Sequence, residues 1–362
     1  MLRNAAAFAA VATEAAARAD ETGKMDACIL AALHRSGLLL APFAPSHGGF
    51  GLGQEDQQAT LGSILRLVGA ADLALARLFE GHVNAVLLVS RYGSTPQIAS
   101  LAASAKDGAL SGVWGAEDAQ GLRCCVEGND RWLEGGKVLA SGAGLVARPL
   151  ITVTTPDGPM LYLLDLPDQT RADNSAWLPL GMKATASGAV DLTGVRVGPD
   201  QQIGVAGDFL RQPFFSAGAW RFCAAQLGAM ERLAALFGEE LRARGRHGDP
   251  YQLERVAQCT AASGTVLFWV EEASRRFGDA SLAPASVVAF SNLTRMVTEH
   301  AALEVMQCVQ RGAGLKAFLR PHPIERICRD LATYLRQPVP DLAMSDAARA
   351  VLAGQLTIGA LP

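Results

Sequence analysis

The chain has 362 residues, of which 50% are hydrophobic and 19% are charged, and its formal net charge is -3. This balance provides no basic face for nucleic acid or anionic lipid, so neither is an expected partner. The length allows two or three packed layers, and the low share of charged residues indicates that another subunit covers part of the surface.

The cysteines and the apolar segments indicate a cytoplasmic protein without a membrane span. The chain has seven cysteines, and the adjacent Cys124 and Cys125 lack the two-residue spacer of a metal or redox motif. We therefore expect free thiols, a reducing compartment and no metal site. The alanine-rich run at 5–12 is followed by charged residues at helical spacing, and no run of about 18 uninterrupted apolar residues occurs.

The periodicity of apolar residues changes twice along the chain. Residues 1–107 have a helical period, which a proline- and glycine-rich loop interrupts at 41–53. Residues 108–204 alternate with a period of two, as at Ile151 and Val153, and predict a small antiparallel β-barrel-like domain. Residues 205–362 return to the helical period and predict a four-helix bundle of long helices. The order argues for an α+β fold and against alternating βαβ units.

Short motifs stand at the junctions between these regions. They are the segments HGGFG (47–51), YGSTPQ (92–97), GAED (115–118), GKVLAS (136–141), LGMKATAS (180–187) and PIERICRD (323–330). In this order and spacing they resemble motifs of the acyl-CoA dehydrogenase superfamily, and the resemblance covers nearly the whole chain. It implies an FAD-dependent oxidoreductase that forms a homodimer or homotetramer and acts on a small-molecule acyl thioester or a related CH–CH substrate.

The resemblance also implies where the flavin ring lies. An isoalloxazine ring accepts a hydride at N5 and gathers negative charge near N1 and O2, so it needs hydrogen-bond donors at its edge and an apolar surface against its face. By resemblance, two strand ends supply this edge, and the hydroxyl of Ser141 lies near N5. The residues concerned are Trp114, Ala116, Glu117, Leu139, Ser141 and Gly142.

A second set of residues is implied for the FAD pyrophosphate, contributed by a neighbouring subunit. Its members are Arg244, Gln307, Gly312 and Gly314. Both turns depart from the family pattern, because His247 replaces a phenylalanine and Arg311 replaces the first glycine. The alternative interpretation is a glycine-capped helix end beside a solvated arginine.

Two further features are expected to be structural. Arg329 and Asp330 are neighbours in the last motif, and adjacent residues on a helix point to different partners. We expect each to satisfy a buried partner between helices. His82 is expected to be a packed or surface histidine rather than a catalytic one.

The position of the family's catalytic base departs most from the pattern. Dehydrogenases of this family remove the substrate's α-proton with a glutamate, and the equivalent position here is Pro338, which cannot accept a proton. The alternative position in the family, on the first long helix after the strands, corresponds to 216–222, which has no carboxylate. Asp341 and Asp346 are the nearest carboxylates in sequence and are weak candidates.

Three functions therefore stand as hypotheses. The first is an acyl-CoA dehydrogenase-like enzyme acting on a CoA or carrier thioester, with an electron-transfer partner; we place it first because the whole-chain resemblance is best to that branch. The second is a flavin monooxygenase or oxidase on the same fold, supplied with reduced flavin by a flavin reductase. The turn at 140–144 resembles that branch, so the residues at the chemical site favour it. The third is a non-catalytic flavoprotein.

Overall fold

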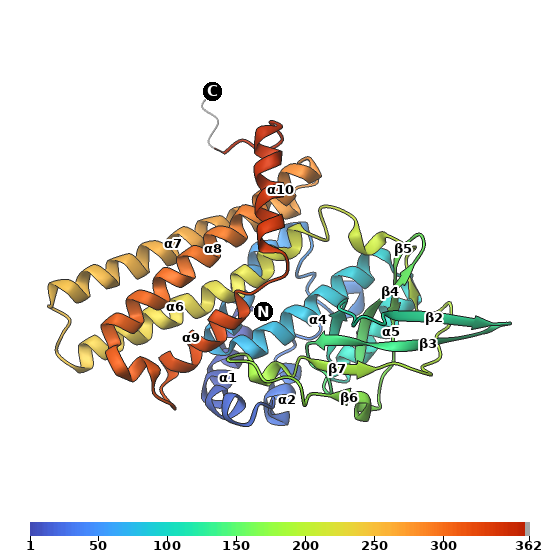
Figure 1. The fold of residues 1–362 in the computed structure, drawn as a ribbon, viewed down its shortest axis with the longest axis horizontal. Helices are drawn as coiled ribbons and strands as arrows, with labels where there is room; N and C mark the ends of the chain where they lie inside the picture. Colours follow the sequence, from blue (N-terminus) through green and yellow to red (C-terminus); the bar gives the residue numbers. More distant parts are fainter. Residues whose placement is uncertain (359–362) are drawn as a thin grey trace.

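The computed structural model describes residues 1–358. It opens with a group of helices. They are α1 (Leu2–Thr22), α2 (Ala27–Arg35), α3 (Gln58–Ala71), α4 (Leu73–Tyr92) and α5 (Thr95–Lys106). Figure 1 shows α1 and α2 at the lower edge and α4 between the C-terminal helices and the strands. Several of these helices begin at residues suited to capping: the side chain of Asp26 accepts a hydrogen bond from the backbone of Cys28 at the start of α2, and Ser94 and Gln97 form a capping box on α5.

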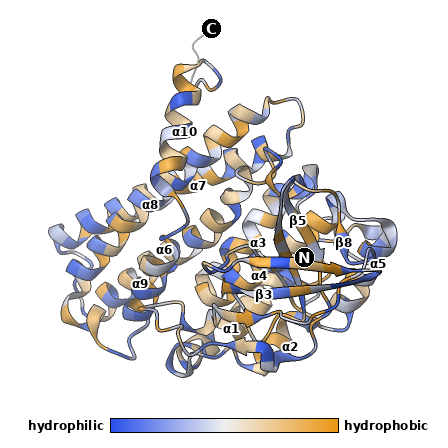
Figure 2. Cartoon of the chain, turned by 45° about the vertical axis from the view of Figure 1, so that its right-hand side comes forward, coloured by the Kyte–Doolittle hydropathy of each residue, from blue (hydrophilic) through white to orange (hydrophobic). Residues whose placement is uncertain are grey.

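Helix α4 runs through the core of the molecule. Asp72 caps it by accepting a hydrogen bond of 3.0 Å from the backbone N–H of Leu75. The helix is long and apolar enough to cross a membrane by length and composition alone, but 72% of its most apolar window is buried inside the fold. Figure 2 shows its apolar residues among those of neighbouring elements. Helix α4 therefore has the burial of a core helix.

The middle of the chain forms two four-stranded sheets, with strand orders β1-β4-β5-β8 and β2-β3-β7-β6. The strands are β1 (Ser111–Trp114), β2 (Leu122–Glu127), β3 (Asp130–Ala140), β4 (Arg148–Thr155), β5 (Gly158–Leu163), β6 (Ala172–Asp173), β7 (Gly188–Asp191) and β8 (Gln202–Ile203). The expectation of an entirely antiparallel unit was wrong, because β1 pairs with β4 in parallel. The β2–β3 hairpin lies between these two strands in sequence and belongs to the other sheet.

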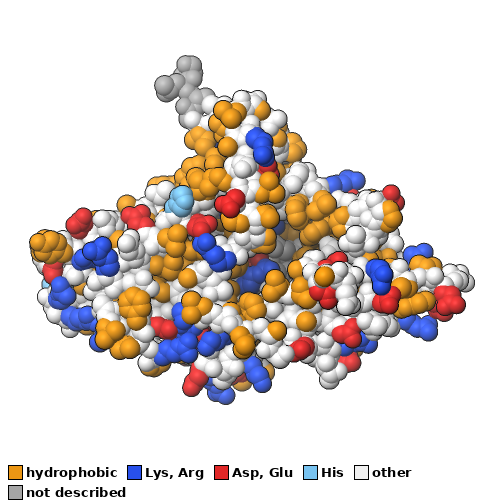
Figure 3. All heavy atoms as spheres, viewed as in Figure 1, with side chains coloured by type: hydrophobic (Ala, Val, Ile, Leu, Met, Phe, Trp, Pro, Cys, Tyr) orange, Lys and Arg blue, Asp and Glu red, His pale blue; other side chains and the backbone are white. Residues whose placement is uncertain are grey.

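The C-terminal part consists of α6 (Trp220–Ala243), α7 (Pro250–Gly278), α8 (Pro284–Ala313), α9 (Pro323–Tyr334) and α10 (Pro340–Leu352). Helices α6 to α9 lie alongside one another, while α10 projects from them (Figure 1). Apolar side chains gather on α10 and at its base (Figure 3), including Leu342, Val351 and Leu352. The α+β class and the helical C-terminal part are confirmed, with α10 as a helix outside the bundle.

Helices α3 and α6 cross with their backbones in close approach. A Cβ atom at Gly69 would lie 2.0 Å from the carbonyl oxygen of Ala225, and one at Gly228 would lie 2.0 Å from that of Arg66. Real Cβ atoms do not approach a backbone this closely, so both positions require glycine. These contacts join the N-terminal helices to the C-terminal ones as one frame.

Helix α9 is tied to the N-terminal half by buried ionic contacts. The guanidinium of Arg329 contacts the carboxylate of Asp20 on α1 at 2.6 Å and that of Glu325 at 2.9 Å. The carboxyl group of Asp330 accepts a hydrogen bond of 2.6 Å from the backbone N–H of Met182, and burial raises the pKa of this carboxyl to about 7. The expected structural role of this pair is confirmed.

Candidate active site

The two strand ends predicted to border the flavin lie side by side. The backbone N–H of Val138 donates to the carbonyl oxygen of Ala116 at 3.1 Å, and the indole N–H of Trp114 donates to the carbonyl oxygen of Ser141 at 3.0 Å. Gly142 continues this edge with φ of +79°, a conformation that favours glycine. The fold thus brings together residues that are more than twenty positions apart in sequence.

Leu139 has the geometry expected of a side chain that covers a ring face. Its φ is +51°, and the β3–β7 pairing shifts register between Lys137 and Ala140, so a bulge turns the side chain outward. The side chain is 65% exposed although it is large and apolar. A leucine held in the left-handed region is strained, and such strain concentrates at functional sites. This exposed apolar surface beside Ala116 fits the face of a flat aromatic ring.

The hydroxyl of Ser141 ends a chain of hydrogen bonds that has a defined direction. Thr185 donates to the carbonyl oxygen of Met182 at 2.9 Å, which uses its only hydroxyl proton. Ser187 lies 2.9 Å from Thr185 and must donate to it, and Ser141 lies 3.1 Å from Ser187 and must donate in turn. The remaining lone pairs of the Ser141 oxygen are therefore available to accept a hydrogen bond from a donor N–H.

Glu117 does not present its carboxylate as a free edge group. Its Oε1 atom lies 2.6 Å from Nζ of Lys137, a lysine whose side chain is fully buried. Nζ also lies 3.1 Å from the hydroxyl of Thr152 and 3.4 Å from the carbonyl oxygen of Gly115. Burial lowers the pKa of the Lys137 ammonium, while Glu117 opposes this shift. Through these contacts Lys137 fixes the position of the Gly115–Glu117 segment.

Lys137 had no role in the sequence-based prediction, although it stands inside one of the quoted motifs. The available signal was a lysine in a strand segment between Gly136 and the apolar residues Val138 and Leu139. Its partner Glu117 is 20 residues away, and no local spacing indicates that pair.

Of the residues predicted to contact a pyrophosphate, Arg244, Gly312 and Gly314 come together where α6 and α8 end, at the opposite end of the helical bundle from the strands (Figure 1). Arg244 donates to the carbonyl oxygen of Ala313 at 3.3 Å and pairs with Glu240 at 2.7 Å. Gly314 has φ of +70°. A Cβ at Gly312 would lie 2.3 Å from the Phe237 ring, so packing alone requires that glycine.

Gln307 lies apart from this turn. It is exposed on α8, in a shallow groove of about 310 Å³ between α7 and α8 that Tyr251 and Arg311 also line. The turn formed by Arg244 and Gly314 therefore carries the candidate pyrophosphate contacts within this chain, while Gln307 faces the side of the helix pair.

The positions that the sequence offered for a catalytic base lie away from the large cavity. The carbonyl oxygen of Pro338 accepts a hydrogen bond of 2.7 Å from Arg295. Asp341 and Asp346 are exposed on α10, where Asp346 pairs with Arg349 at 2.6 Å. Neither aspartate lines the large cavity described next.

A cavity of about 970 Å³ lies between α4, the first turn of α6, the segment 209–215 and the connection from α7 to α8. Gly115, from the segment predicted to border the flavin, forms part of its wall. A volume of this size is typical of sites for small organic molecules. The cavity is therefore large enough for a substrate and lies next to the candidate flavin edge.

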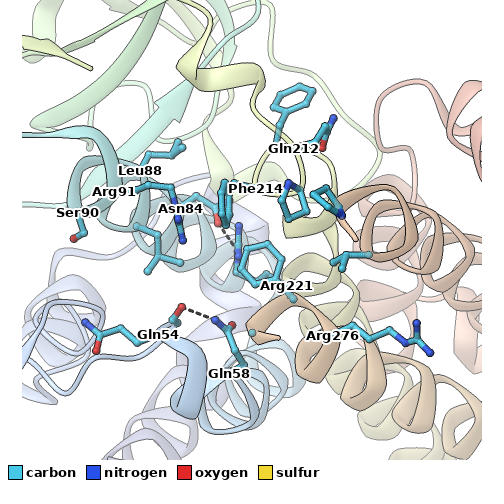
Figure 4. A pocket seen from close by; sticks show the side chains of 18 of the residues that line it. Gln54, Gln58, Asn84, Leu88, Ser90, Arg91, Gln212, Phe214, Arg221 and Arg276 are labelled. Carbon is cyan, nitrogen blue, oxygen red and sulfur yellow. Dashed lines mark hydrogen bonds between the residues drawn. The ribbon is translucent and has the colours of Figure 1, made fainter. Parts of the chain in front are cut away.

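A polar network runs along one wall of this cavity (Figure 4). Nε of Arg221 donates to the side-chain oxygen of Asn84 at 2.7 Å. The amide nitrogen of Asn84 and the guanidinium of Arg77 both donate to the buried carboxylate of Glu80. Arg221 was not among the predicted site residues, although an arginine in an otherwise apolar helix start was a visible signal.

Asp279 is the one carboxylate among the described residues that line the cavity. It accepts a hydrogen bond of 3.0 Å from the backbone N–H of Ser281 and lies 3.5 Å from Arg275. The Ser281 hydroxyl also donates a hydrogen bond to Asp279. This bond contributes most, and together the contacts lower the pKa of the Asp279 carboxyl. Because a general base must hold a proton with moderate affinity, Asp279 is poorly suited to that role.

His82 is a buried structural residue. Its Nε2 atom lies 2.8 Å from the carbonyl oxygen of Leu39, and its Nδ1 accepts a hydrogen bond of 3.1 Å from the backbone N–H of Ser111. These partners require a neutral ring with the proton on Nε2. Burial lowers the pKa of this imidazole to about 4. Within residues 1–358, no group of three or more His, Cys, Asp or Glu could hold a metal ion.

Comparison with solved structures identifies the architecture. No family model matches the sequence, and no curated protein matches it significantly. Dibenzothiophene monooxygenase from Paenibacillus sp. A11-2 superimposes with a TM-score of 0.86 at 19% identity, over 98% of this chain and 97% of that chain. Butyryl-CoA dehydrogenase from Megasphaera elsdenii superimposes with a TM-score of 0.84 at 16% identity, over 97% of each chain. The chain has the acyl-CoA dehydrogenase fold.

Enzymes of more than one kind have this fold. Methanesulfinate monooxygenase from Pseudomonas fluorescens superimposes with a TM-score of 0.84 at 18% identity, over 99% of this chain and 98% of that chain. The resemblance found in the sequence is thereby confirmed at the level of the fold. The solved structures named here thus include two monooxygenases and one acyl-CoA dehydrogenase.

Proposed function

We propose that the protein is a flavin-dependent monooxygenase that uses reduced flavin and oxygen to oxygenate a small organic substrate in the large cavity. The observation that carries this proposal is the lack of a suitable base. Among the described residues that line the cavity, the one carboxylate is Asp279, which Ser281 and Arg275 already occupy. Desaturation of an acyl thioester needs a base for the α-proton, whereas oxygenation does not.

The hydroxyl chain supports a role with reduced flavin. Thr185 and Ser187 orient Ser141 so that its oxygen accepts a hydrogen bond, and reduced flavin carries an N–H at N5 where oxidised flavin has a bare nitrogen. Bound reduced flavin supplies the electrons for the reaction with oxygen. In this proposal Ser141 binds the N–H edge, Leu139 covers one face of the ring, and Lys137 with Glu117 keeps the adjoining segment in place.

We further propose that the flavin is FMN, delivered by a separate reductase. The dibenzothiophene monooxygenase of the same fold is also known in an FMN-bound form, which supports FMN by analogy. The turn around Arg244 departs from the FAD pattern at His247 and Arg311, and the Arg244 guanidinium already contacts Glu240 within its own chain. FAD bound through a neighbouring subunit, as the resemblance implies, is the alternative.

Two measurements test the proposal. In the first, the purified protein with oxidised flavin is mixed anaerobically with acyl-CoA thioesters of several chain lengths. We expect no bleaching of the flavin absorbance within seconds, because the cavity provides no base. Bleaching at about 1 to 1,000 per second, the common range for enzymes, would overturn the proposal in favour of dehydrogenation. Asp341→Asn and Asp346→Asn would then be the first variants to examine.

In the second measurement, the protein receives reduced FMN from a reductase under isotopically labelled oxygen, together with a panel of organic substrates. We expect one labelled oxygen atom in a product. Ser141→Ala should lower the yield of product per flavin oxidised, because the N–H edge loses its acceptor. The matched control is Ser63→Ala, since Ser63 lies on α3 and its hydroxyl bonds only to the carbonyl oxygen of Ala59.

A further inference from the structure

Arg221 is a buried cation with an unused hydrogen-bond donor. Its side chain lines the large cavity, and the residue is 6% exposed. Nε is satisfied by Asn84, but Nη1 is buried and has no hydrogen-bond partner among the described residues. A charged donor that is removed from water without a partner is costly, so positions of this kind normally have an acceptor in the working protein.

The guanidinium is held in this position by its surroundings. A Cβ at Gly218 would lie 2.3 Å from Nη2 of Arg221, so the glycine provides the space that the guanidinium occupies. On the other side, Asn84 is fixed through Glu80, which also binds Arg77. The arginine is therefore placed in advance and does not need to reorganise when an acceptor arrives.

The charge on the cavity wall is predominantly positive. Among the described residues that line it, four are arginines and one, Asp279, is a carboxylate. Two of these arginines have their own carboxylates, because Arg77 pairs with Glu80 and Arg276 pairs with Glu272. Arg221 has a neutral partner in Asn84 instead. Figure 4 shows Arg221 and Asn84 meeting at the centre of the cavity, while Arg276 points away from them.

Aromatic rings lie next to this cation. The guanidinium carbon of Arg221 is 5.2 Å from the centre of the Phe277 ring, whose centre is 6.2 Å from that of the Phe214 ring. The guanidinium carbon of Arg91 lies 3.4 Å from the centre of the Phe214 ring. Both phenylalanines line the cavity. A ligand with an anionic group and an apolar body would meet complementary surfaces here, since guanidinium groups bind carboxylates through paired N–H donors and rings pack against apolar bodies.

We propose that the cavity binds an organic anion whose carboxylate or similar oxyanion accepts a hydrogen bond from Nη1 of Arg221, with its apolar part against Phe214 and Phe277. This inference rests on the proposed function, because it names the substrate class of the same cavity. It predicts that the protein distinguishes an organic acid from the neutral molecule of the same shape.

The test compares carboxylates with their primary amides. Phenylacetate, 4-phenylbutyrate and indole-3-acetate, each beside its amide, are titrated into the full-length protein by calorimetry, with and without saturating FMN. We expect at least one acid to bind about 10- to 100-fold more tightly than its amide, the usual range for a buried charge-assisted hydrogen bond. Equal binding of acid and amide in every pair, or no binding by any acid, would overturn the proposal. Competition by inorganic phosphate alone, without preference for any acid, would also overturn it.

Three variants locate the preference. Arg221→Gln should abolish the preference for acids over amides. Gly218→Ala should reduce this preference, because the new methyl group displaces the guanidinium of Arg221 but leaves its charge. Arg276→Gln is the matched control and should retain the preference, because that arginine is occupied by Glu272. Unfolding midpoints establish that each variant is folded. If Arg221→Gln retains the preference for acids, Arg221 is not the anion site.

These results are independent of the oxygen chemistry. The preference for acids is measured without turnover, so it can hold even if no labelled oxygen enters a product. Conversely, loss of the preference in a protein that still oxygenates a neutral substrate would reject the anion site and leave the monooxygenase proposal intact.

Discussion

The buried pair of Lys137 and Glu117 offers a quantitative test of how the flavin-edge segment is held. We predict that Lys137→Met and Glu117→Gln each lower the free energy of unfolding, while the double variant recovers part of the loss. The reason is that each single change leaves the partner in a poorly hydrated place without its counter-charge. The side chain of Lys137 is fully buried, whereas that of Glu117 is 18% exposed.

The magnitude follows from the geometry. At the observed 2.6 Å separation and an effective dielectric constant of about 20, the attraction between the charges is about 6 kcal/mol. Desolvation costs several kcal/mol for each ion, so the net contribution of the intact pair is small. Breaking a buried pair costs about 3 to 5 kcal/mol. We place Lys137→Met at the lower end, because water reaches Glu117, and expect a coupling energy of about 1 to 3 kcal/mol from the double-mutant cycle.

The assay is urea unfolding of the four proteins, repeated between pH 7 and pH 10. Burial lowers the pKa of the Lys137 ammonium below its value in the unfolded chain, and removal of Glu117 should lower that pKa further. Between the folded and unfolded pKa values the unfolded chain binds more protons, so the stability of Glu117→Gln should rise as the pH increases. Additive single effects, or a Glu117→Gln protein whose stability does not depend on alkaline pH, would refute the reasoning.

Three other predictions concern the frame and the cofactor. Burial lowers the pKa of His82 from 6.5 to about 4. As the pH falls through this range, the unfolded chain binds a proton that the folded protein does not, so the free energy of unfolding of the wild type should fall by about 1.4 kcal/mol per pH unit. Urea unfolding of His82→Gln should lack this component. Gly69→Ala should destabilise the protein by about 1 to 3 kcal/mol or more, because its Cβ would meet the carbonyl oxygen of Ala225, whereas Gly264→Ala, with open space around its Cβ, should be neutral or stabilising in thermal unfolding. Arg244→Ala should weaken flavin binding by about 1.5 to 3 kcal/mol if this arginine contacts phosphate, and an unchanged dissociation constant in fluorescence titration would exclude that contact.

The order of helices, strands and helices was predictable from the sequence. A buried helix face repeats apolar residues every three to four positions, and a buried strand face repeats them every two. The parallel pairing of β1 with β4 was not predictable in this way, since two strands separated by a hairpin carry no local sign of their relative direction. The α10 helix was likewise merged with the bundle, because its helical period is the same whether the helix packs inside or projects.

In the candidate site, too, some features were predictable from the sequence and others were not. The approach of the 114–117 and 139–142 segments was predicted by resemblance to ordered motifs, and the structure places these segments side by side. The contact between Arg221 and Asn84 joins residues 137 positions apart, and the pairing of Lys137 with Glu117 spans 20. Such partners are selected by tertiary packing, whereas the contacts of Glu80 with Arg77 and Asn84, three and four residues away on α4, follow a spacing visible in sequence.

The walls of the large cavity differ in how freely they can change during evolution. One side belongs to α4 and α6, and α6 is locked to α3 where glycines let the backbones meet, so a larger residue there would shift the whole frame. Other parts of the wall come from the connecting segments at 209–215 and 278–284, and connecting segments tolerate insertions and substitutions better than packed helices do. Insertions or substitutions in these connections can therefore reshape the space around a fixed cation. A lineage built on this frame can diversify the apolar portion of its ligands while keeping their charged end, and the same two segments are where a designer would begin to alter selectivity.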